Sequence, residues 1–311
     1  MTAIVNVNGR ISDEREAVIP VFDHGFLYGE GVYETLRTYY ERPFLLDRHL
    51  RRLRTSAEMI SLSVPLTDGQ FEARIAETER AARTRLGAEP CDWYIRILLT
   101  RGVGDLTYDP ATCPTPSIVI IVKPFEAPKP EVYEQGVMVA LVSIVRNHPD
   151  SVNPLIKSNN LLNNALAMQE AFRRGAFEGV MRNYRGELSE CTTANLFVVK
   201  NGEALTPPLA SGLLAGITRE FVFELGRAEA IPVREAVLRD KDLFDADEVF
   251  LTSTTRELVP ITRVDEHVIA SGRPGPVTRK LLDAFRQQAQ VLTRTAGGRQ
   301  PAAGGEQSVA S

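Results

Sequence analysis

The sequence predicts an α+β protein built from two domains. Short strand patterns recur in both halves of the chain, and two of them end in the hairpin dipeptides Asn8-Gly9 and Asn201-Gly202. Segments with apolar residues at helical spacing lie between the strands. Three prolines fall within residues 124–130, the clearest linker signal in the chain. We therefore expect a smaller N-terminal domain, a linker and a larger C-terminal domain over residues 1–123, 124–133 and 134–292.

Composition narrows the classes of function. The 311 residues are 43% hydrophobic and 24% charged, as in an ordinary globular protein with a sizeable core. The net charge is -4, with 36 basic and 40 acidic residues interspersed, so no basic surface for nucleic acid or an anionic membrane is expected. A small-molecule substrate is favoured instead.

Cysteine and histidine usage gives no support for a disulfide framework or a metal site. The three cysteines are widely spaced, and the four histidines form no HExxH pattern. The N-terminus has no signal-peptide pattern, and no apolar run approaches the roughly 20 residues of a membrane helix. We expect a cytoplasmic protein without a bound metal.

Elements of the N-terminal half follow from periodicity and punctuation. The alternation of residues 3–9 predicts a strand that turns at the first hairpin dipeptide. Asp47 is expected to cap a helix with an apolar face that extends to Ile60, and a second helix is expected to end at Gly87. Further strands are predicted at 32–40, 93–100 and 118–122.

The C-terminal half alternates strands and helices in the same way. A helix is predicted from Lys157 to about Arg174, where Gly175 ends it, and another begins after Gly216. Strands are predicted at 137–145, 178–183, 188–199 and 248–251, and a last helix at 277–290. The tail from Thr293 is rich in Gly, Ala, Ser and Gln, and we expect residues 293–311 to be disordered.

Lys157 is the residue around which the chemistry is expected to be organised. Leu155 and Ile156 precede it, so its ammonium is expected to lie at a junction between elements with little water around it. Such an amine can become the nucleophile that forms a Schiff base with an aldehyde cofactor or a carbonyl substrate. For a lone lysine, a snorkelling or ion-paired side chain is the commoner explanation.

Four other features are each ambiguous alone. Glu190 stands in a small-polar segment with no basic residue within five positions, and Arg96 lies on an apolar strand, two residues from Tyr94 on the same face. The arginine must pair with an anion, either a substrate carboxylate or an internal one. Gly216 before Thr218 offers the free N–H groups of a helix start, which can bind an anion or simply begin a helix. Four hydroxyl residues, 252–255, follow a strand.

Together these features match the requirements of pyridoxal 5′-phosphate, and their order resembles the class IV aminotransferases, which are fold-type IV pyridoxal phosphate enzymes. The resemblance runs from Asn6 to about Gln290. Its most specific segments are residues 156–161 (Ile-Lys-Ser-Asn-Asn-Leu), 186–190 with Asn195-Leu196-Phe197, and 216–219 (Gly-Ile-Thr-Arg). It implies a smaller sheet-plus-helices domain, followed by a larger pseudo-barrel domain that binds the cofactor.

The resemblance also implies roles for individual residues. Lys157 is implied to carry the cofactor and to transfer the proton at the substrate Cα, and Glu190 to pair with the pyridine nitrogen. Arg52 matches the family's phosphate-binding arginine, and Leu214 is implied to lie against the ring. The other implied cofactor-binding residues are Ile217, Thr218, Ser253 and Thr254.

The sequence motifs expected around the substrate resemble those of prokaryotic branched-chain amino acid aminotransferases. The implied substrate-binding residues are Tyr28, Tyr33, Arg37, Tyr94, Arg96 and Thr255. Arg96 is our candidate for binding the second carboxylate of glutamate. We expect a ping-pong reaction in which branched-chain L-amino acids donate their amino group to 2-oxoglutarate. The resemblance further implies a homodimer, with Tyr28 and the 102–110 loop reaching the neighbouring subunit's site.

Three positions depart from the branched-chain pattern and keep alternatives open. Leu161 stands where a tyrosine is usual, and Ser253-Thr254-Thr255 stands where Gly-Thr-Ala is usual; both are similar to D-amino acid aminotransferases. Thr35 replaces a small glycine and is expected to narrow the pocket. The alternatives are a D-amino acid or (R)-amine transaminase and, with less support, an aminodeoxychorismate lyase. A non-catalytic binding protein is disfavoured because Lys157 and Glu190 are both present.

Overall fold

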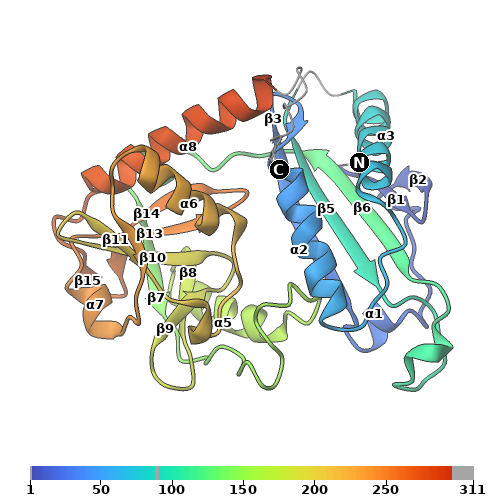
Figure 1. Ribbon diagram of the computed structural model, residues 1–311, viewed down its shortest axis with the longest axis horizontal. Coiled ribbons are helices and arrows are strands. Elements are labelled where there is room, and N and C mark those ends of the chain that lie inside the picture. Colours follow the sequence, from blue (N-terminus) through green and yellow to red (C-terminus); the bar gives the residue numbers. More distant parts are fainter. Residues whose placement is uncertain (1, 88–90, 296–311) are drawn as a thin grey trace, which may run out of the picture.

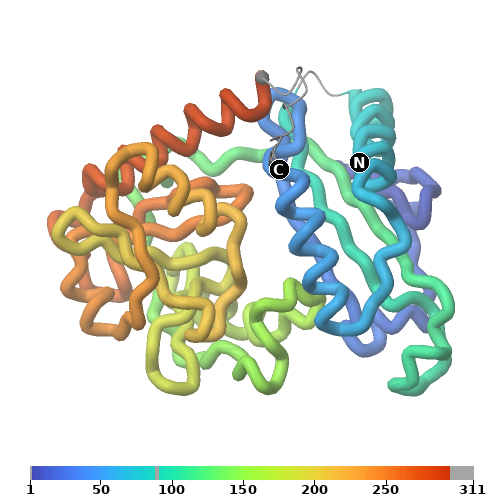
Figure 2. The backbone as a smooth tube through the Cα atoms, viewed as in Figure 1, coloured from blue at the N-terminus to red at the C-terminus, as the bar shows by residue number. Residues whose placement is uncertain are grey.

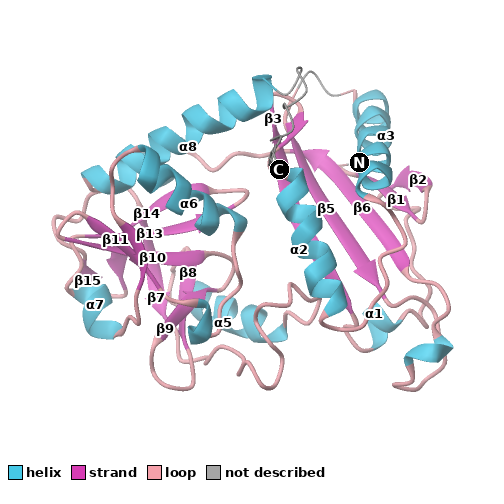
Figure 3. Ribbon diagram, in the orientation of Figure 1, coloured by secondary structure: helices cyan, strands magenta, loops and turns pink. Residues whose placement is uncertain are grey.

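The computed structural model describes residues 2–87 and 91–295, and it shows two β-sheets, each with its own helices (Figure 1; Figure 3). The first sheet has six strands in the order β2-β1-β6-β5-β3-β4, and the second has nine, with β15 beside β14. The predicted α+β class is confirmed. The backbone passes from the first sheet to the second through the segment after β6 (Figure 2).

The first sheet is antiparallel throughout its described pairings and carries two long helices. Its elements are β1 (Ile4–Val7), β2 (Arg10–Asp13), α1 (His24–Leu27), β3 (Gly31–Tyr39), β4 (Arg42–Pro43), α2 (Leu46–Glu58), α3 (Asp68–Leu86), β5 (Trp93–Thr100) and β6 (Ser117–Pro124). The apolar stripe of α2, which includes Leu50 and Leu53, is buried in one core with Phe71 of α3 and the inner face of the sheet.

The second sheet is mixed and curls into a half-barrel (Figure 1). Its strands are β7 (Val137–Leu141), β8 (Glu178–Arg182), β9 (Leu188–Cys191), β10 (Asn195–Lys200), β11 (Glu203–Thr206), β12 (Val233–Glu235), β13 (Glu248–Ser253), β14 (Glu257–Val264) and β15 (His267–Val268). Its helices are α4 (Pro130–Glu134), α5 (Leu162–Arg173), α6 (Ile217–Ala228), α7 (Asp240–Phe244) and α8 (Pro276–Thr295).

Local signals placed the turns and several helix ends correctly. Asn8 and Gly9 both have positive φ between β1 and β2, as do Asn201 and Gly202 between β10 and β11. Helix α3 begins with a Thr67–Gln70 capping box and ends at Gly87 with φ of 60°.

Helix α5 begins five residues later than predicted, so Lys157 is not helical. Tyr33 N–H donates to the Lys157 carbonyl at 2.9 Å, and Asn159 N–H donates to the Gly31 carbonyl at 2.9 Å. These bonds hold residues 157–159 beside the start of β3. Because the backbone groups bond to β3, they are not available for the hydrogen bonds of a helix. The helix therefore starts at Leu162.

Other boundaries also differ from the predictions. Leu45, not Asp47, is the N-cap of α2, and the strand predicted at 137–145 ends at Leu141. The strand predicted at 188–199 is two strands, because residues 192–194 leave the sheet between β9 and β10. Helix α8 continues to Thr295, so disorder from residue 293 is wrong for the first three residues; positions 296–311 lie outside the described residues. The limits of the two domains at 124–133 stay a prediction.

An aromatic cluster joins the two parts. The Phe285 ring of α8 lies 5.6 Å from Phe44 and 6.3 Å from Tyr39, both from the first part, and 5.6 Å from Phe221 of α6. The Tyr39 hydroxyl also donates to Glu257 of β14 at 2.9 Å. This packing fixes the two sheets relative to each other. Within the described residues, no helix is both long and apolar enough to cross a membrane.

Candidate active site

A cavity of about 320 Å³ lies between the two sheets, within the size range of small-molecule sites. Both sheets contribute to its wall. Of the fourteen predicted site residues, twelve line it: Tyr33, Arg52, Tyr94, Arg96, Lys157, Glu190, Leu214, Ile217, Thr218, Ser253, Thr254 and Thr255.

Lys157 is held in the wall by its backbone. Its N–H donates to the Ser56 hydroxyl at 3.1 Å, and its carbonyl accepts from Tyr33. The Nζ atom lies 4.4 Å from the centroid of the Tyr33 ring. It has no carboxylate partner among residues 2–87 and 91–295, so the ion-paired alternative finds no support there. The amine is available to a ligand in the cavity.

Arg52 is fixed by a buried carboxylate. Its Nε and Nη2 donate to Glu34 at 2.7 and 2.8 Å, and its Nη1 donates to the Ala215 carbonyl at 2.9 Å. Burial alone would raise the pKa of Glu34, but the Arg52 charge and the His49 ring outweigh it and lower that pKa to about 2. The guanidinium thus reaches from α2 across to the residues before α6.

The start of α6 lies beside this arginine, and no side chain of the described residues caps its first backbone N–H groups. Gly216 is the N-cap and supplies no side-chain cap, and Thr218 of the first turn is buried at the cavity. A Cβ at position 216 would lie 1.8 Å from Asn195 Oδ1, so only glycine allows this close approach. Arg52 and a helix start with its dipole make an anion site suited to phosphate.

The sequence around Glu190 suggested an unpaired carboxylate, but in the structure Glu190 is paired. Its Oε1 accepts from Arg146 Nε at 2.8 Å, and its Oε2 accepts from the Leu214 N–H at 3.1 Å and from Asn195 Nδ2 at 3.3 Å. Arg146 is 44 positions away in the chain, so a search of nearby residues could not find it. The pair keeps a fixed carboxylate in the cavity wall.

Arg96 lies in the cavity without a protein carboxylate. Its Cζ is 4.3 Å from the centroid of the Tyr33 ring, and the alternation of β5 puts Tyr94 on the same side. No ion pair joins Arg96 to a carboxylate in the described part of the chain. Of the two partners considered for this arginine, the structure favours a substrate carboxylate.

Arg37 and Tyr28 are the two predicted substrate residues that do not line this cavity. Arg37 is buried between the rings of Tyr39 and Phe125, at 4.0 and 3.7 Å, with Glu257 at 3.8 Å. Its charge and both of its faces are thus engaged by protein groups, and its role in substrate binding stays a prediction. The Tyr28 ring packs 5.0 Å from that of Tyr108, on the loop after β5.

The residues present fit pyridoxal phosphate. An amine, a carboxylate and an anion site surround one cavity, where the cofactor would meet Lys157, Glu190 and Arg52. Among the residues that the structure describes, the buried Thr252 hydroxyl has no hydrogen-bond partner, which leaves a polar group for a ligand. Leu161 and Thr35, the positions at which the chain departs from the branched-chain pattern, also line the cavity.

Sequence reasoning missed several polar residues of the wall. Arg146, Thr193, Asn195 and Arg256 all line the cavity, although none was singled out as a site residue. The signal that could have indicated Arg256 is its place directly after the hydroxyl cluster 252–255.

Comparison with known proteins agrees with this geometry. The family model for class IV amino-transferases matches residues 31–264. The chain belongs to the class IV aminotransferases. A Methanocaldococcus jannaschii protein with the provisional name branched-chain-amino-acid aminotransferase is 40% identical over 282 residues, covering 91% of this aminotransferase and 95% of the relative. The D-alanine aminotransferase of Bacillus licheniformis is 32% identical over 292 residues, covering 93% and 97%.

Solved structures place the fold in the same group. The branched-chain amino acid aminotransferase of Thermobaculum terrenum, in its PLP form, has a TM-score of 0.80 and 28% identity, with 92% of this aminotransferase and 93% of that chain covered. The predicted fold type and family are confirmed, and the family uses pyridoxal phosphate.

Proposed function

We propose that this aminotransferase transfers the amino group of L-leucine, L-isoleucine or L-valine to 2-oxoglutarate by a ping-pong reaction with pyridoxal phosphate. One observation carries the proposal: Lys157 Nζ and Arg96 Cζ approach the same Tyr33 ring, at 4.4 and 4.3 Å. A substrate that places its amine at Lys157 can therefore reach a guanidinium with a carboxylate. The relatives that carry branched-chain names support the choice of substrate.

Bound pyridoxal phosphate supplies an aldehyde that takes up the amino group and a ring that accepts electrons. Lys157 Nζ would take the proton from the substrate Cα and deliver it to the cofactor carbon C4′. Glu190, held by Arg146, would accept a hydrogen bond from the ring nitrogen. Arg52 and the first turn of α6 hold the phosphate, so the reacting atoms stay in register.

Both substrates must use one pocket, and Arg96 is proposed to discriminate between them. Leucine has an apolar side chain that can lie against Tyr33 and Ile156, whereas glutamate has a second carboxylate for the guanidinium. Arg96→Ala is expected to slow the L-glutamate half-reaction about 10- to 100-fold more than the L-leucine half-reaction. The loss of visible cofactor absorbance in single-turnover mixing measures both rates, and equal losses would refute this role.

A D-amino acid or (R)-amine transaminase is the second candidate. Leu161 and Ser253-Thr254-Thr255 line the cavity, and the D-alanine aminotransferase relative covers nearly the whole chain. The deciding experiment mixes holoenzyme separately with L-leucine, D-alanine and (R)-1-phenylethylamine. Rapid bleaching by L-leucine alone supports the branched-chain proposal, and bleaching by D-alanine or the amine alone supports the alternative. Production of 4-aminobenzoate from aminodeoxychorismate would indicate a lyase instead.

We also propose that the working form is a homodimer. Exposed apolar residues gather on two adjoining segments. Phe22 lies just before α1 and Phe26 within it, and Val103, Leu106 and Tyr108 lie after β5. Gly104 N–H donates to the Phe22 carbonyl at 3.2 Å, so these segments lie side by side. A second copy on this face would cover the apolar residues and bring Tyr28 towards the neighbouring cavity.

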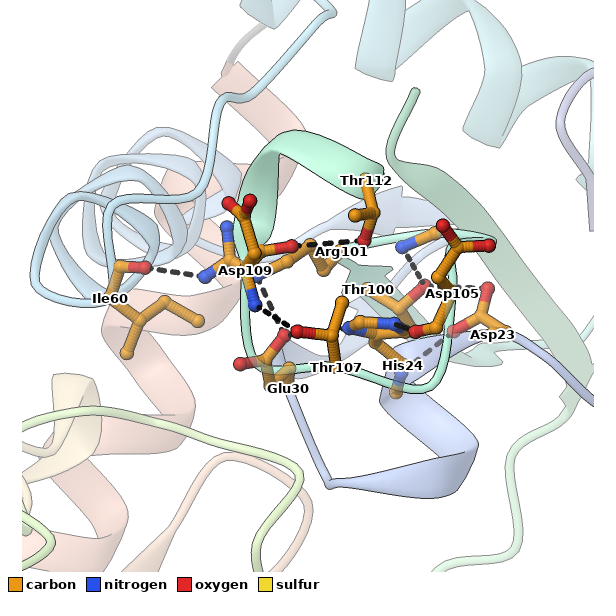
Figure 4. Close-up of polar contacts among 12 residues, drawn as sticks. Asp23, His24, Glu30, Ile60, Thr100, Arg101, Asp105, Thr107, Asp109 and Thr112 are labelled. Atoms are coloured by element: carbon orange, nitrogen blue, oxygen red, sulfur yellow. Dashed lines mark hydrogen bonds and ion pairs between the residues drawn. The ribbon is translucent and has the colours of Figure 1, made fainter. Parts of the chain in front are cut away.

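Polar contacts hold this face in shape (Figure 4). His24 Nε2 lies 2.8 Å from the Asp105 carbonyl, and Arg101 donates from Nε to Glu30 at 2.7 Å and from Nη2 to the Ile60 carbonyl at 2.7 Å. The 101–112 loop is thereby tied to α1 and to the end of α2. A preformed loop lowers the entropy cost of association.

A further inference from the structure

Arg256 is one of four arginines that line the cavity, with Arg52, Arg96 and Arg146, and the family resemblance gave it no role. It lies in the turn between β13 and β14, directly after Thr255, and its side chain is 17% exposed. Arg96 comes from the first sheet and Arg256 from the second. Arg52 and Arg146 also line the cavity, but they pair with Glu34 and Glu190, so each part of the chain contributes one further arginine.

The side chain of Arg256 is held rigidly. Its Nη2 donates to Glu178 Oε2 at 3.0 Å and to the Thr193 hydroxyl at 2.5 Å, and its Nε donates to the Ser253 hydroxyl at 3.2 Å. Glu178 is fully buried and also accepts from the Thr193 hydroxyl at 2.7 Å. Few rotamers are open to the arginine, so it is preorganised for a ligand.

One nitrogen of the Arg256 guanidinium has no hydrogen-bond partner among the described residues. Within residues 2–87 and 91–295, Nη1 of Arg256 has no hydrogen-bond partner, whereas Nε and Nη2 are both engaged. A guanidinium that served only to neutralise Glu178 would not need to line the cavity. Nη1 can donate a charge-assisted hydrogen bond to an anion in the cavity without giving up the bonds that fix the side chain.

The surroundings of Arg256 indicate which anion it meets. Ser253 and Thr254 precede it in the predicted cofactor-binding segment, and its partner Thr193 lies in the short connection between β9, which carries Glu190, and β10. The α-carboxylate is attached to the carbon that bears the amine, so it must stay beside the cofactor. A side-chain carboxylate extends away from that carbon and can reach the other wall, where Arg96 lies.

We propose that Arg256 binds the α-carboxylate of the amino-acid substrate, together with the Thr255 hydroxyl. Arg96 then remains for the side-chain carboxylate of glutamate. This assignment rests on the proposed transamination of amino acids. It holds for either substrate chirality, because L- and D-amino acids share the α-carboxylate.

The test compares substrates with and without that carboxylate on holoenzyme. Arg256→Gln removes the charge, and Arg256→Lys keeps a charge for Glu178 if the first variant folds poorly. We expect both variants to raise the apparent Kd for L-leucine, L-glutamate and 4-methylpentanoate, by about 10- to 100-fold for Arg256→Gln. The half-reaction with 3-methylbutylamine, which is leucine without its carboxylate, is expected to be unchanged.

A matched control and the opposite outcomes complete the experiment. Arg263→Gln changes an exposed arginine on the same strand β14 and is expected to leave all four ligands unaffected. Equal losses for the amine and the amino acids would show a structural role and overturn the proposal. A loss confined to L-glutamate would assign Arg256 to the side-chain carboxylate and overturn it too, as would unchanged binding of every carboxylate.

Failure of the branched-chain proposal is distinguishable from failure of this one. If wild type reacts with D-alanine and not with L-leucine, the same comparison is made between D-alanine and ethylamine. A carboxylate-specific loss in that pair still supports Arg256. If wild type reacts with amines and with no amino acid, both proposals are overturned.

Discussion

At the scale of single residues, two charged side chains that line the cavity are each fixed by an ion pair with a buried partner. Glu34 fixes Arg52, and Arg146 fixes Glu190. A flexible side chain in either place would lose its conformational entropy on each binding of the cofactor, which would weaken that binding. The paired partner has therefore been ordered already by folding.

Glu34→Gln tests whether this pairing serves the phosphate. The amide keeps the shape but loses the charge that orients Arg52, so we expect the Kd for pyridoxal phosphate to rise about tenfold or more. The Kd for pyridoxal, which lacks the phosphate, is expected to change much less. Fluorescence titration of the apoprotein measures both.

The control for Glu34→Gln is Glu224→Gln. Glu224 of α6 pairs at 2.5 Å with Arg48, which lies on α2 as Arg52 does. Neither Glu224 nor Arg48 lines the cavity. Its replacement is expected to leave both Kd values unchanged. A similar loss for pyridoxal and its phosphate in Glu34→Gln would mean that the variant merely disturbs the fold.

At the scale of elements, helix α3 carries a carboxylate that is poorly satisfied. Glu79 Oε1 is buried without a hydrogen-bond partner in the described part of the protein. Burial raises the pKa of Glu79 to about 7, and the nearby Arg83 only partly opposes this. The helix is thus destabilised whenever Glu79 is ionised.

The pH dependence of Glu79→Gln follows from that pKa. In the unfolded chain Glu79 titrates near its ordinary 4.5, so the folded state binds more protons between 4.5 and 7. The cost of ionising Glu79 is therefore present above pH 7 and disappears as the pH falls through 4.5. Glu79→Gln is expected to raise the free energy of unfolding by about 1–3 kcal/mol at pH 8 and by little at pH 4.5.

Urea unfolding of wild type and variant at several pH values measures this difference. Glu77→Gln, at an exposed position on the same helix, is the control and is expected to show a small difference at every pH. A constant gain for Glu79→Gln from pH 4.5 to pH 8 would contradict the shifted pKa.

At the scale of the whole molecule, the exposed apolar face around α1 and the loop after β5 is expected to join two copies. The chain has a mass of 34.4 kDa, so sedimentation of wild type should give about twice that value. Phe26→Lys puts a charge into this face and is expected to shift the equilibrium towards the monomer and lower activity.

Val268→Lys is the matched control for that variant, since it adds the same charge at an exposed apolar position on β15. It is expected to stay a dimer with full activity. Wild type that sediments as a fully active monomer would refute the dimer and, with it, the role of Tyr28 in a neighbouring site.

Much of the fold could be predicted from the sequence, and twelve of the fourteen predicted site residues line the cavity. Neighbouring residues decide the Asn-Gly turns, the capped helix α3 and the alternation of β5. These features can therefore be predicted from short stretches of sequence. The order of Lys157, Glu190, Gly216 and the hydroxyl cluster was enough to indicate the family. Arg37 shows the limit, because its segment suggested a pocket residue and only packing reveals the rings and carboxylates that enclose it.

The sequence by itself thus determined the class of fold and the family, and it predicted which lysine and carboxylate carry the chemistry. Only the tertiary structure decided that Lys157 precedes its helix, that Arg146 pairs with Glu190, and that Arg256 faces Arg96 across the cavity from the other sheet. The physical reason is that local backbone preferences act within a few residues. Pairing of buried charges depends on contacts between segments tens of residues apart, and those distances exist only once the two sheets have packed together.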